Sequence, residues 1–572
     1  MKINIADFTT TKSKRSNFLV IILLGLITYV FHHSALSGFW RIDDGVHLAF
    51  AADHSPWQYF FVPEITGKQS NYHFVTPWNV FFYDMNLWLF GLKPKWFYAH
   101  QLMMLWLNSI ATFFLIRLWG QARWAFWGAI LFLLGAPTVH AAQELMLCHY
   151  VTGLFFSILA LICYVYAVRE QDKRLLLLSA FFYLLATTCK EFYVPLVGIL
   201  LFLPEGNFKK RLYYSIPFAL VALMYVIWRY NVLGGYFIGG YNPETAPVKY
   251  LDNASKLLSN FWRIPYDMLG SGKMGSYVLA VLSVISIAYF ARNTYKIFIF
   301  LAGLVLILTP LIPMSQYIGT RERFFFLSWW AVSVYCSILF SKYTRFRAIT
   351  YITGISMLFL AASTSYKEMT ISSAHAVWKC HDAVTRFIIN SSADQIFYDS
   401  NNVWYPASLV ARPLLEAEKA ICPSSPRRAY IISDFIVLSI SGLKGKAVFG
   451  YNDSCQCVEK IDDKVPELII QKNIKNKKLF VDLKYENKYL TWNVGPYEKG
   501  VYKVLLKHDS KYLGGYFTMG TYPNKGSIRL EEEKAINFYI IYESPEGWST
   551  CSELIHFEPK ENYKLNWSNN YY

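Results

Sequence analysis

Eleven apolar stretches divide the first 365 residues of the chain, and short polar loops separate most of them. A helix that crosses a bilayer needs about 20 apolar residues. The stretches are 17–38, 100–118, 123–140, 150–168, 174–190, 192–205, 212–231, 276–291, 296–313, 324–341 and 347–365. The run 192–205 is short and could be a re-entrant or tilted piece, but the loop charges fit only if it counts as a span. The pattern predicts a polytopic α-helical membrane protein with about eleven spans.

Basic residues gather in alternate short loops, as the positive-inside rule describes for cytoplasmic loops. With the N-terminus inside, the inner loops carry Arg117 and Arg123, then Arg169, Lys173 and Arg174, then Lys209, Lys210 and Arg211, then Arg292 and Lys296, then Lys342, Arg345 and Arg347. The alternate loops, above all residues 39–99, are richer in Asp, Glu, His, Tyr and Pro. We therefore expect the N-terminus inside and the tail from residue 366 outside.

The tail, residues 366–572, has a different pattern. Apolar and polar residues alternate along parts of it, and Gly- and Pro-containing turns separate these runs, as in β-strands. The alternating runs are 478–484, 489–494 and 501–507, and a helical stretch lies near 407–420. The sequence thus predicts a membrane domain over 1–365 and a C-terminal α/β-to-β domain over 366–572.

Composition supports the membrane assignment and excludes nucleic acid as a partner. Hydrophobic residues make up 54% of the chain and charged residues 16%, against about 25% charged in a typical soluble domain. Residues 366–572 hold 26 Lys and Arg against 24 Asp and Glu, whereas residues 1–365 hold 29 against 15. Nearly all of the basic excess of the chain, +16, therefore lies in residues 1–365 beside the apolar spans, where the positive-inside rule accounts for it.

Five of the nine cysteines lie in the tail: Cys380, Cys422, Cys455, Cys457 and Cys551. An oxidising compartment would allow some of them to pair, but the spacing alone does not say which. Cys455 and Cys457 lack the second ligand pair of a zinc site, so we expect no metal there.

Asp43 and Asp44 follow the first span, where two adjacent carboxylates could deprotonate a hydroxyl group or hold a metal ion. The alternative is an ordinary loop or a helix N-cap, a position that Asp favours. At the outer end of the third span, His140 and Glu144 are four residues apart and would share a helix face; an ordinary polar loop is the alternative.

Further charged residues lie at the predicted outer boundary, where charge is costly and is usually paired or functional. Lys190 and Glu191 lie between two apolar runs, and Lys190 could bind a phosphate or pair with a neighbouring helix. Arg229, Arg321 and Arg323 lie outside, against the positive-inside trend. Guanidinium groups suit phosphate binding, although snorkelling toward lipid headgroups is an alternative for each.

In order along the chain, these residues resemble the motifs of the GT-C superfamily of membrane glycosyltransferases, which includes protein O-mannosyltransferases and aminoarabinose transferases. The resemblance covers about residues 18–340. It includes the acidic pair at Asp43, the segment from Thr76 through Gly91-Leu92-Lys93-Pro94 to His100, Pro137 to Glu144, Lys190-Glu191 to Pro195, Arg229 before Gly234-Gly235-Tyr236, and Tyr317 to Phe324.

The resemblance implies a polyprenyl-phosphate-linked sugar donor and transfer with inversion. Asp43 or Asp44 would be the general base, Glu144 would orient the acceptor or assist, and the donor phosphate would contact Arg229, Arg321, Arg323 and Lys190. His47, His140 and Glu191 would be acceptor or accessory residues.

Three departures from the family pattern limit what can be carried over. The Arg-Pro pair that many relatives have in the first loop is replaced by Val75-Thr76-Pro77, and the Trp-Trp-Asp-Tyr-Gly motif of oligosaccharyltransferases is absent. Some members use a divalent metal and others do not. His47, Glu64 and His149 are the residues that could join Asp43 in such a site, and no metal is assigned.

The sequence therefore predicts a transferase of a bacterial inner membrane that takes sugar from an undecaprenyl-phosphate carrier. Its acceptor would be an envelope glycan or lipid, such as O-antigen, lipopolysaccharide or lipid A, on the periplasmic face. One alternative is an O-antigen-type polymerase or ligase, but such enzymes depend on a late outer loop, whereas the acidic pair here is early. The other is a non-enzymatic flippase for lipid-linked glycans, for which the long tail would be unusual.

Overall fold

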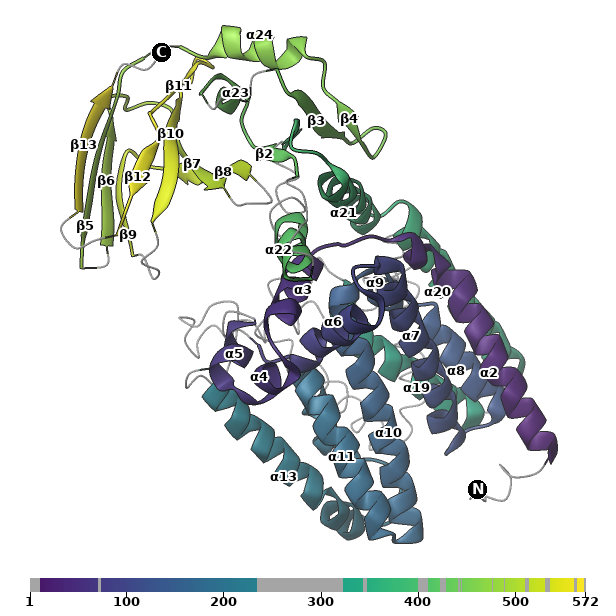
Figure 1. Cartoon of the computed structure of the whole chain (residues 1–572). Coiled ribbons are helices and arrows are strands. Elements are labelled where there is room, and N and C mark those ends of the chain that lie inside the picture. The colour runs from purple at the N-terminus through teal and green to yellow at the C-terminus, as the bar shows by residue number, and fades with distance from the viewer. Residues whose placement is uncertain are drawn as a thin grey trace. The chain divides into compact units, whose positions relative to one another are not determined.

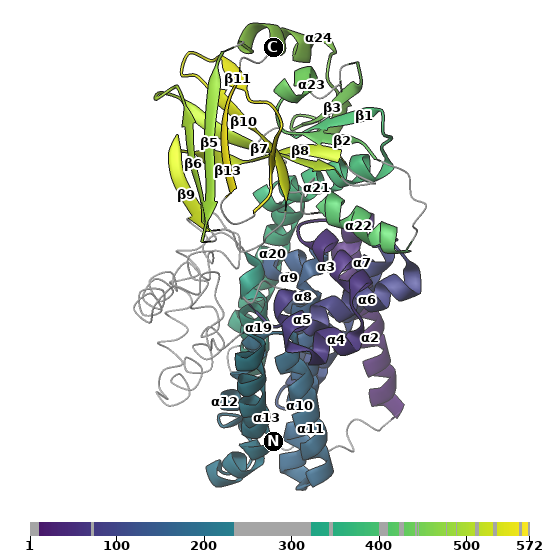
Figure 2. The ribbon, with the colours of Figure 1, turned by 60° about the vertical axis from the view of Figure 1, so that its left-hand side comes forward.

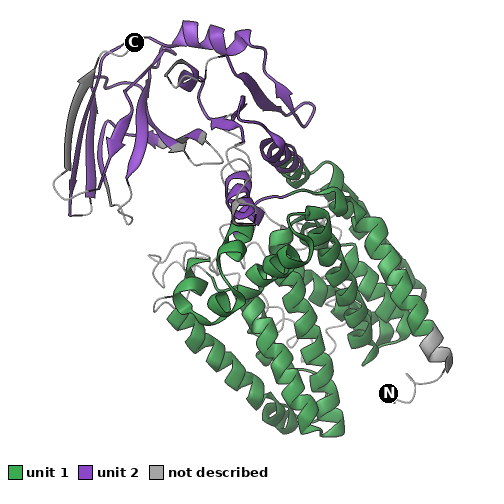
Figure 3. Cartoon of the chain, in the orientation of Figure 1, with its two compact units in different colours: residues 1–39, 47–378 green, residues 40–46, 379–572 purple. Residues whose placement is uncertain are grey.

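The computed structural model describes residues 11–69, 74–233, 322–342, 347–399, 410–421, 428–440, 443, 445–475, 477–487, 489–509, 514–529, 535–559 and 563–569. The chain divides into two compact units (Figure 3). Unit 1 comprises residues 1–39 and 47–378, and unit 2 comprises residues 40–46 and 379–572. This division by contacts differs from the expected boundary at 365/366, because unit 2 takes in a short segment of the N-terminal half. The catalytic and soluble roles of the two parts remain predictions.

Helices make up the described part of unit 1, and α3 begins in unit 2. In chain order they are α2 (Thr11–His32), η1 (His33–Ser37), α3 (Asp44–Asp53), α4 (Pro56–Phe61), α5 (Pro63–Lys68), α6 (Pro77–Phe90), α7 (Pro94–Arg117), α8 (Ala122–Leu133), α9 (Ala136–Gln143), η2 (Leu145–Leu147), α10 (Cys148–Glu170), α11 (Lys173–Cys189), η3 (Glu191–Tyr193), α12 (Leu196–Leu200), α13 (Phe208–Val232), η5 (Glu322–Phe325), α19 (Phe326–Lys342) and α20 (Arg347–Thr370); α21 (Ser373–Asn390) crosses into unit 2.

Six of these helical segments are long and apolar enough to cross a membrane, and α8 with α9 makes a seventh if this pair, bent by 58°, is one span. The class predicted from the sequence, a polytopic helical membrane protein, is confirmed. The stretch 192–205 contains only the short η3 and α12. The predicted stretches 276–291 and 296–313 lie outside the described residues, so the number eleven remains a prediction.

The spanning helices differ in how much of their surface the protein covers. Within the apolar windows of α10 and α7, 61% and 56% of residues are buried, but only 22% in those of α2 and α13. The apolar side chains that α2 and α13 expose include Phe18, Ile22 and Leu220. In a bilayer such side chains can face lipid without the penalty that water would impose. Figure 1 shows α10, α11 and α13 side by side.

The bend between α8 and α9 has a local cause. Gly135 lies between the two helices as the N-cap of α9, and a Cβ atom there would lie 2.0 Å from the Trp329 indole nitrogen, so only glycine fits. Pro137 then occupies the first turn of α9, where its fixed φ suits a helix start and its missing N–H costs nothing. The bend sets the direction of α9, the helix that carries His140.

Unit 2 begins its sheet with parallel strands. β1 (Gln395–Tyr398) pairs in parallel with β2 (Tyr430–Ile432) and with β3 (Ala447–Asn452), and β2 also pairs in parallel with β8 (Gly514–Tyr522). The order across this sheet is β11-β10-β7-β8-β2-β1-β3-β4, and β12 pairs with β10. The remaining strands are β4 (Cys457–Lys460), β7 (Val501–Asp509), β10 (Ile536–Glu543), β11 (Ser549–Cys551) and β12 (Ile555–Phe557).

A second, antiparallel sheet has the order β13-β5-β6-β9, and Figure 2 shows it as a separate layer beside β7 and β10. Its strands are β5 (Leu479–Glu486), β6 (Tyr489–Gly495), β9 (Lys525–Arg529) and β13 (Tyr563–Asn569). Alternate β5 residues, from Leu479 to Tyr485, are buried against β7 and β10. The predicted strands at 478–484, 489–494 and 501–507 are confirmed as β5, β6 and β7, and the α/β-then-β character of the tail is confirmed with them.

Helices cover both faces of the parallel strands. Val384 and Ile388 of α21 and Leu415 of α22 (Arg412–Ile421) pack against Phe397 and Ile431. On the other face, α23 (Ile436–Ile440) and α24 (Lys464–Asn473) contribute to a core around Ile396 and Ile432. The helical stretch predicted near 407–420 is α22.

Candidate functional site

The predicted acidic pair lies in a tight turn of unit 2. The Asp44 N–H donates to the Arg41 carbonyl oxygen (2.9 Å), and the Arg41 N–H donates to Asp44 Oδ2 (2.7 Å). Asp44 is fully buried and begins α3, and its carboxylate closes the turn by accepting the N–H of Arg41, three residues earlier. Asp43 is half-buried and is a central residue of the turn. The two carboxylates therefore occupy different environments.

Unit 2 holds this turn through α21 and the start of α22. Arg41 donates from Nε to Asp382 Oδ1 (2.7 Å) and from Nη2 to Asp382 Oδ2 (2.6 Å). The Ile42 N–H donates to His381 Nδ1 (3.0 Å). A Cβ atom on Gly45 would lie 2.1 Å from the Val410 carbonyl oxygen, so the backbone packs there at a distance that only glycine permits.

Glu144 is the centre of a buried charged cluster in unit 1. His140 Nδ1 lies 2.8 Å from Glu144 Oε1 and His140 Nε2 lies 2.9 Å from Glu368 Oε1, so the imidazole bridges two carboxylates. Arg323 Nη1 donates to Glu144 Oε2 (3.1 Å), and Trp378 Nε1 donates to Glu144 Oε1 (3.2 Å). His140 and Glu144 are in contact, as predicted, but Glu144 follows the end of α9 with an extended backbone, so the two residues do not share a helix face.

The partners of Glu144 determine its protonation. Burial alone would raise the pKa of this carboxyl, but the His140 hydrogen bond and the positive charges of His140 and Arg323 outweigh burial and hold the pKa at about 2. A carboxylate with so low a pKa is a poor proton acceptor. Its geometry suits holding Arg323 and His140 in place.

Lys190, Glu191 and Arg229 form a second buried cluster in unit 1. Lys190 Nζ lies 3.7 Å from Glu191 Oε1 and 4.0 Å from the centre of the Phe74 ring. Arg229 Nη1 lies 3.8 Å from Glu191 Oε2, beyond hydrogen-bond length, and neither atom has a hydrogen-bond partner among the described residues. Two cations thus flank one carboxylate, and unused hydrogen-bonding groups remain.

Electrostatic interactions connect the two clusters. The positive charges of Arg229 and Arg323 repel that of Lys190, and the charges of Lys190 and Arg323 act in the same way on His149. His149 also interacts with His47, whose Nε2 lies 3.0 Å from Asn79 Nδ2. Lys190, Glu191, Arg229, Arg323, Glu144 and His140, six residues singled out from the sequence, are therefore brought into one region of unit 1. Arg321 lies outside the described residues.

Several residues of these clusters were not anticipated. Glu368 and Trp378 complete the surroundings of His140 and Glu144, and His381 and Asp382 hold the acidic turn. Glu368 lies just after the last predicted apolar stretch, a position comparable to that of Asp43 after the first, and this could have marked it. His381 and Asp382 lie within an amphipathic helix and carry no distinguishing signal.

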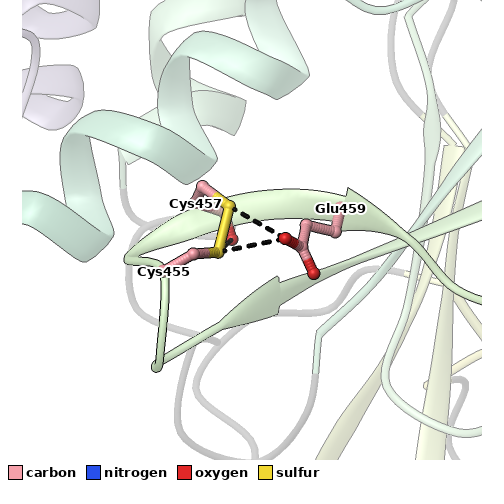
Figure 4. Close-up of side chains that lie close together, drawn as sticks. All are labelled: Cys455, Cys457 and Glu459. Atoms are coloured by element: carbon pink, nitrogen blue, oxygen red, sulfur yellow. Dashed lines mark hydrogen bonds between the residues drawn. A yellow bond between two sulfur atoms is a disulfide. The ribbon is translucent and has the colours of Figure 1, made fainter.

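Metal-ligating side chains gather in one place among the described residues, at Cys455, Cys457 and Glu459 in the hairpin that joins β3 and β4 (Figure 4). There the two cysteines form a disulfide, and Glu459 Oε1 lies 3.3 and 3.4 Å from the two sulfurs. Sulfurs joined in this way are not metal-binding thiolates. Within the described part of the chain, His47, Glu64 and His149 do not form a ligand group.

The carboxyl ends of β1 and β3 border a cavity of about 330 Å³, the lower end of the range for small-ligand pockets. It is lined by Tyr398, Gly450, Tyr451, Asn452, Glu459, Lys460 and Ile461. Asp399, the next residue after β1, is 1% exposed, and its carboxylate has no hydrogen-bond partner among the described residues. Burial raises the pKa of Asp399 to about 8.

The fold and these clusters define a multi-pass membrane protein with buried charge between its helices and a sheet-rich second unit. No protein-family model and no curated protein matches the chain. Among solved structures it is similar to the archaeal oligosaccharyltransferase AglB from Archaeoglobus fulgidus in complex with an inhibitory peptide and a dolichol-phosphate, with a TM-score of 0.38 and 10% sequence identity.

The match covers 71% of this chain and 64% of the archaeal protein, less than two thirds of its length.

Proposed function

We propose that the chain is a membrane glycosyltransferase that takes a sugar from a polyprenyl-phosphate donor, undecaprenyl phosphate in a bacterial inner membrane. The observation that carries the proposal is the cluster of Lys190 and Arg229 around Glu191. Buried charges are normally paired and hydrogen-bonded. Among the described residues, two cations share the single carboxylate of Glu191, and Arg229 Nη1 has no hydrogen-bond partner there, although Tyr225 also lies beside this guanidinium. A phosphate group supplies the missing charge and acceptor oxygens.

Arg323 would act with this cluster. Its guanidinium is held by Glu144 and interacts electrostatically with Lys190. In the transfer, the sugar–phosphate C–O bond breaks and the lipid phosphate leaves with the bonding electrons. Fixed cations beside that phosphate stabilise the charge that develops on it, the usual form of electrostatic catalysis.

Asp43 would be the general base. It would take the proton of the acceptor hydroxyl as the oxygen attacks the anomeric carbon from the side opposite the phosphate, which inverts the configuration. Asp44 is fully buried and receives the Arg41 N–H, so its role would be to shape the turn. This assigns the base to Asp43, a choice that the adjacent pair in the sequence leaves open. The proposed steps involve no metal ion.

The acceptor would be an envelope glycan or lipid of the O-antigen or lipopolysaccharide type. The transfer would occur on the periplasmic face, with unit 2 in the periplasm and the N-terminus in the cytoplasm. The support for this orientation is the row of basic inner loops. The Cys455–Cys457 disulfide fits an oxidising compartment, since disulfides persist there and are rare in the cytosol.

The test is transfer of radiolabelled sugar by the full chain in detergent, with undecaprenyl-phosphate sugars and lipopolysaccharide as acceptor. We expect Asp43→Asn to abolish transfer while donor binding persists, and Arg229→Met to weaken donor binding. Asp44→Asn is expected to reduce activity together with thermal stability. Arg174→Met removes an exposed arginine at the start of α11 and serves as the matched control.

Two results would overturn the proposal. One is transfer that is indifferent to both Asp43→Asn and Arg229→Met. The other is the absence of transfer from every carrier despite donor binding; movement of the lipid-linked donor across proteoliposomes in that case would favour the flippase alternative.

A further inference from the structure

The segment that carries the acidic pair belongs structurally to unit 2. Residues 40–46 group with residues 379–572, although the chain on both sides of the segment belongs to unit 1 (Figure 3). The contacts that hold the segment therefore come from residues more than 300 positions later in the chain.

The strongest of these contacts is between Arg41 and Asp382. Two parallel N–H···O bonds join the guanidinium to both carboxylate oxygens, at 2.7 and 2.6 Å, and the two side chains are 5% and 14% exposed. A two-point contact of this kind fixes direction as well as distance. Arg41 is thus oriented by α21, and so is the backbone that continues into Ile42.

The Arg41–Asp382 contact holds an unusual backbone conformation at Ile42. Its φ angle is +50°, in the left-handed region that β-branched residues rarely adopt. A turn with positive φ at its first central residue normally has glycine there. Strained residues persist only where the surroundings enforce them, and they concentrate at functional sites. Here the surroundings are the Arg41–Asp382 pair and the bond from the Ile42 N–H to His381 Nδ1.

The opposite end of the segment is held as well. Asp44 closes the turn onto Arg41, and Gly45 packs against the Val410 carbonyl at the start of α22. Asp43 is left as the half-buried residue between these fixed points. The direction of its carboxylate therefore depends on α21 on one side and on α22 on the other.

We propose that Asp382 and His381 are positioning residues of the transferase: acting through Arg41 and the Ile42 N–H, they hold the strained turn that presents Asp43 to the acceptor hydroxyl. The inference rests on the proposed function.

The first test is Asp382→Asn in the full chain, with Asp382→Glu as the conservative variant. Asparagine keeps the shape but offers one acceptor oxygen, so the fork is lost. Misplacing a reacting group by about 1 Å can cost on the order of 100-fold in rate. We expect kcat to fall between about 10- and 100-fold while the KM for the donor is unchanged, and Asp382→Glu to recover part of the loss. Asp463→Asn, which breaks the exposed pair with Lys460, is the matched control.

The second test combines Asp382→Asn with Ile42→Gly. Glycine adopts positive φ without strain, so the turn no longer needs the full clamp to form. We expect the double variant to be several-fold more active than Asp382→Asn alone. A carboxylate that merely stabilised unit 2 would not be rescued by a change at residue 42.

Three results would overturn the inference: wild-type kcat in Asp382→Asn, a loss that follows the thermal stability of the whole protein, or no rescue by Ile42→Gly. If the wild type shows no transfer, the proposed function fails. Hydrogen exchange then tests the clamp separately. Amide exchange over residues 40–46 should be faster in Asp382→Asn than in Asp463→Asn, and equal rates would refute the clamp.

Discussion

Replacing Glu144 by glutamine should destabilise unit 1 in a pH-dependent way. In the folded protein the pKa of Glu144 is about 2, against an ordinary value of 4.5. The difference of about 2.5 units, at about 1.4 kcal/mol per unit, corresponds to roughly 3 kcal/mol of stability at neutral pH. Solvent screens this carboxylate little, because the Glu144 side chain is only 4% exposed.

The direction in which stability changes with pH follows from the direction of the pKa shift. The folded-state pKa lies below the unfolded value, so the stabilisation is fully present above about pH 4.5 and is lost as the pH falls toward 2. Glu144→Gln should therefore lower the free energy of unfolding by about 3 kcal/mol at pH 7. The difference from the wild type should shrink below pH 4.5.

Thermal unfolding in detergent, followed by tryptophan fluorescence, is a suitable assay. We expect the Tm of Glu144→Gln to fall by on the order of 5 °C at pH 7. Glu170→Gln changes an exposed carboxylate at the end of α10 and should leave the Tm unchanged. Equal Tm values for Glu144→Gln and the wild type at pH 7, or a gap that widens on acidification, would refute the charge network around Glu144.

Three further predictions concern other parts of the molecule. Arg229→Lys keeps the charge but loses the guanidinium fork, so the KM for the polyprenyl-phosphate donor should rise about tenfold while kcat changes less; equal KM values would contradict the phosphate role. Burial raises the pKa of Asp399 to about 8 in the folded state, so the free energy of unfolding of the wild type should fall as the pH rises from about 4 to about 8. Asp399→Asn should remove this pH dependence. Unfolding free energies of the wild type and the variant that change in parallel with pH would contradict the prediction. Replacing both Cys455 and Cys457 by serine opens only a very short loop, so the Tm should stay within about 1 °C, and mass spectrometry after alkylation should show both thiols of the wild type blocked until a reductant is added.

Apolar length and alternation were enough to predict several of the long helices and three strands of the tail. The stretches 100–118, 150–168 and 212–231 correspond to α7, α10 and α13, because a spanning helix leaves a run of apolar residues that little else produces. Alternation likewise predicted β5 to β7, and in β5 every second residue is buried. The pairing of β1 with β2 and β3 involves distant segments and left no local trace in the sequence.

In the candidate site, too, a contact between residues close in sequence was predicted, whereas contacts between distant residues were not. The contact between His140 and Glu144 was predicted from their four-residue spacing, and it forms although Glu144 lies just beyond the end of α9. Arg323 was expected at the donor phosphate, and its bond to Glu144 was not foreseen because 179 positions separate the two residues. The partners of the acidic pair were missed for the same reason, because His381 and Asp382 contact the turn only in the folded chain, where α21 lies against it.

The Arg41–Asp382 contact also has a consequence for synthesis of the protein. Its two residues are 341 positions apart in the chain. Ribosomes add about 5–20 residues per second, so roughly 20 to 70 s pass between the appearance of the first partner and the second. During that interval most of the apolar helices have already been made, and the acidic turn still has no support for its strained residue. Nascent chains that stop before α21 should therefore enter the membrane without a formed Asp43 turn.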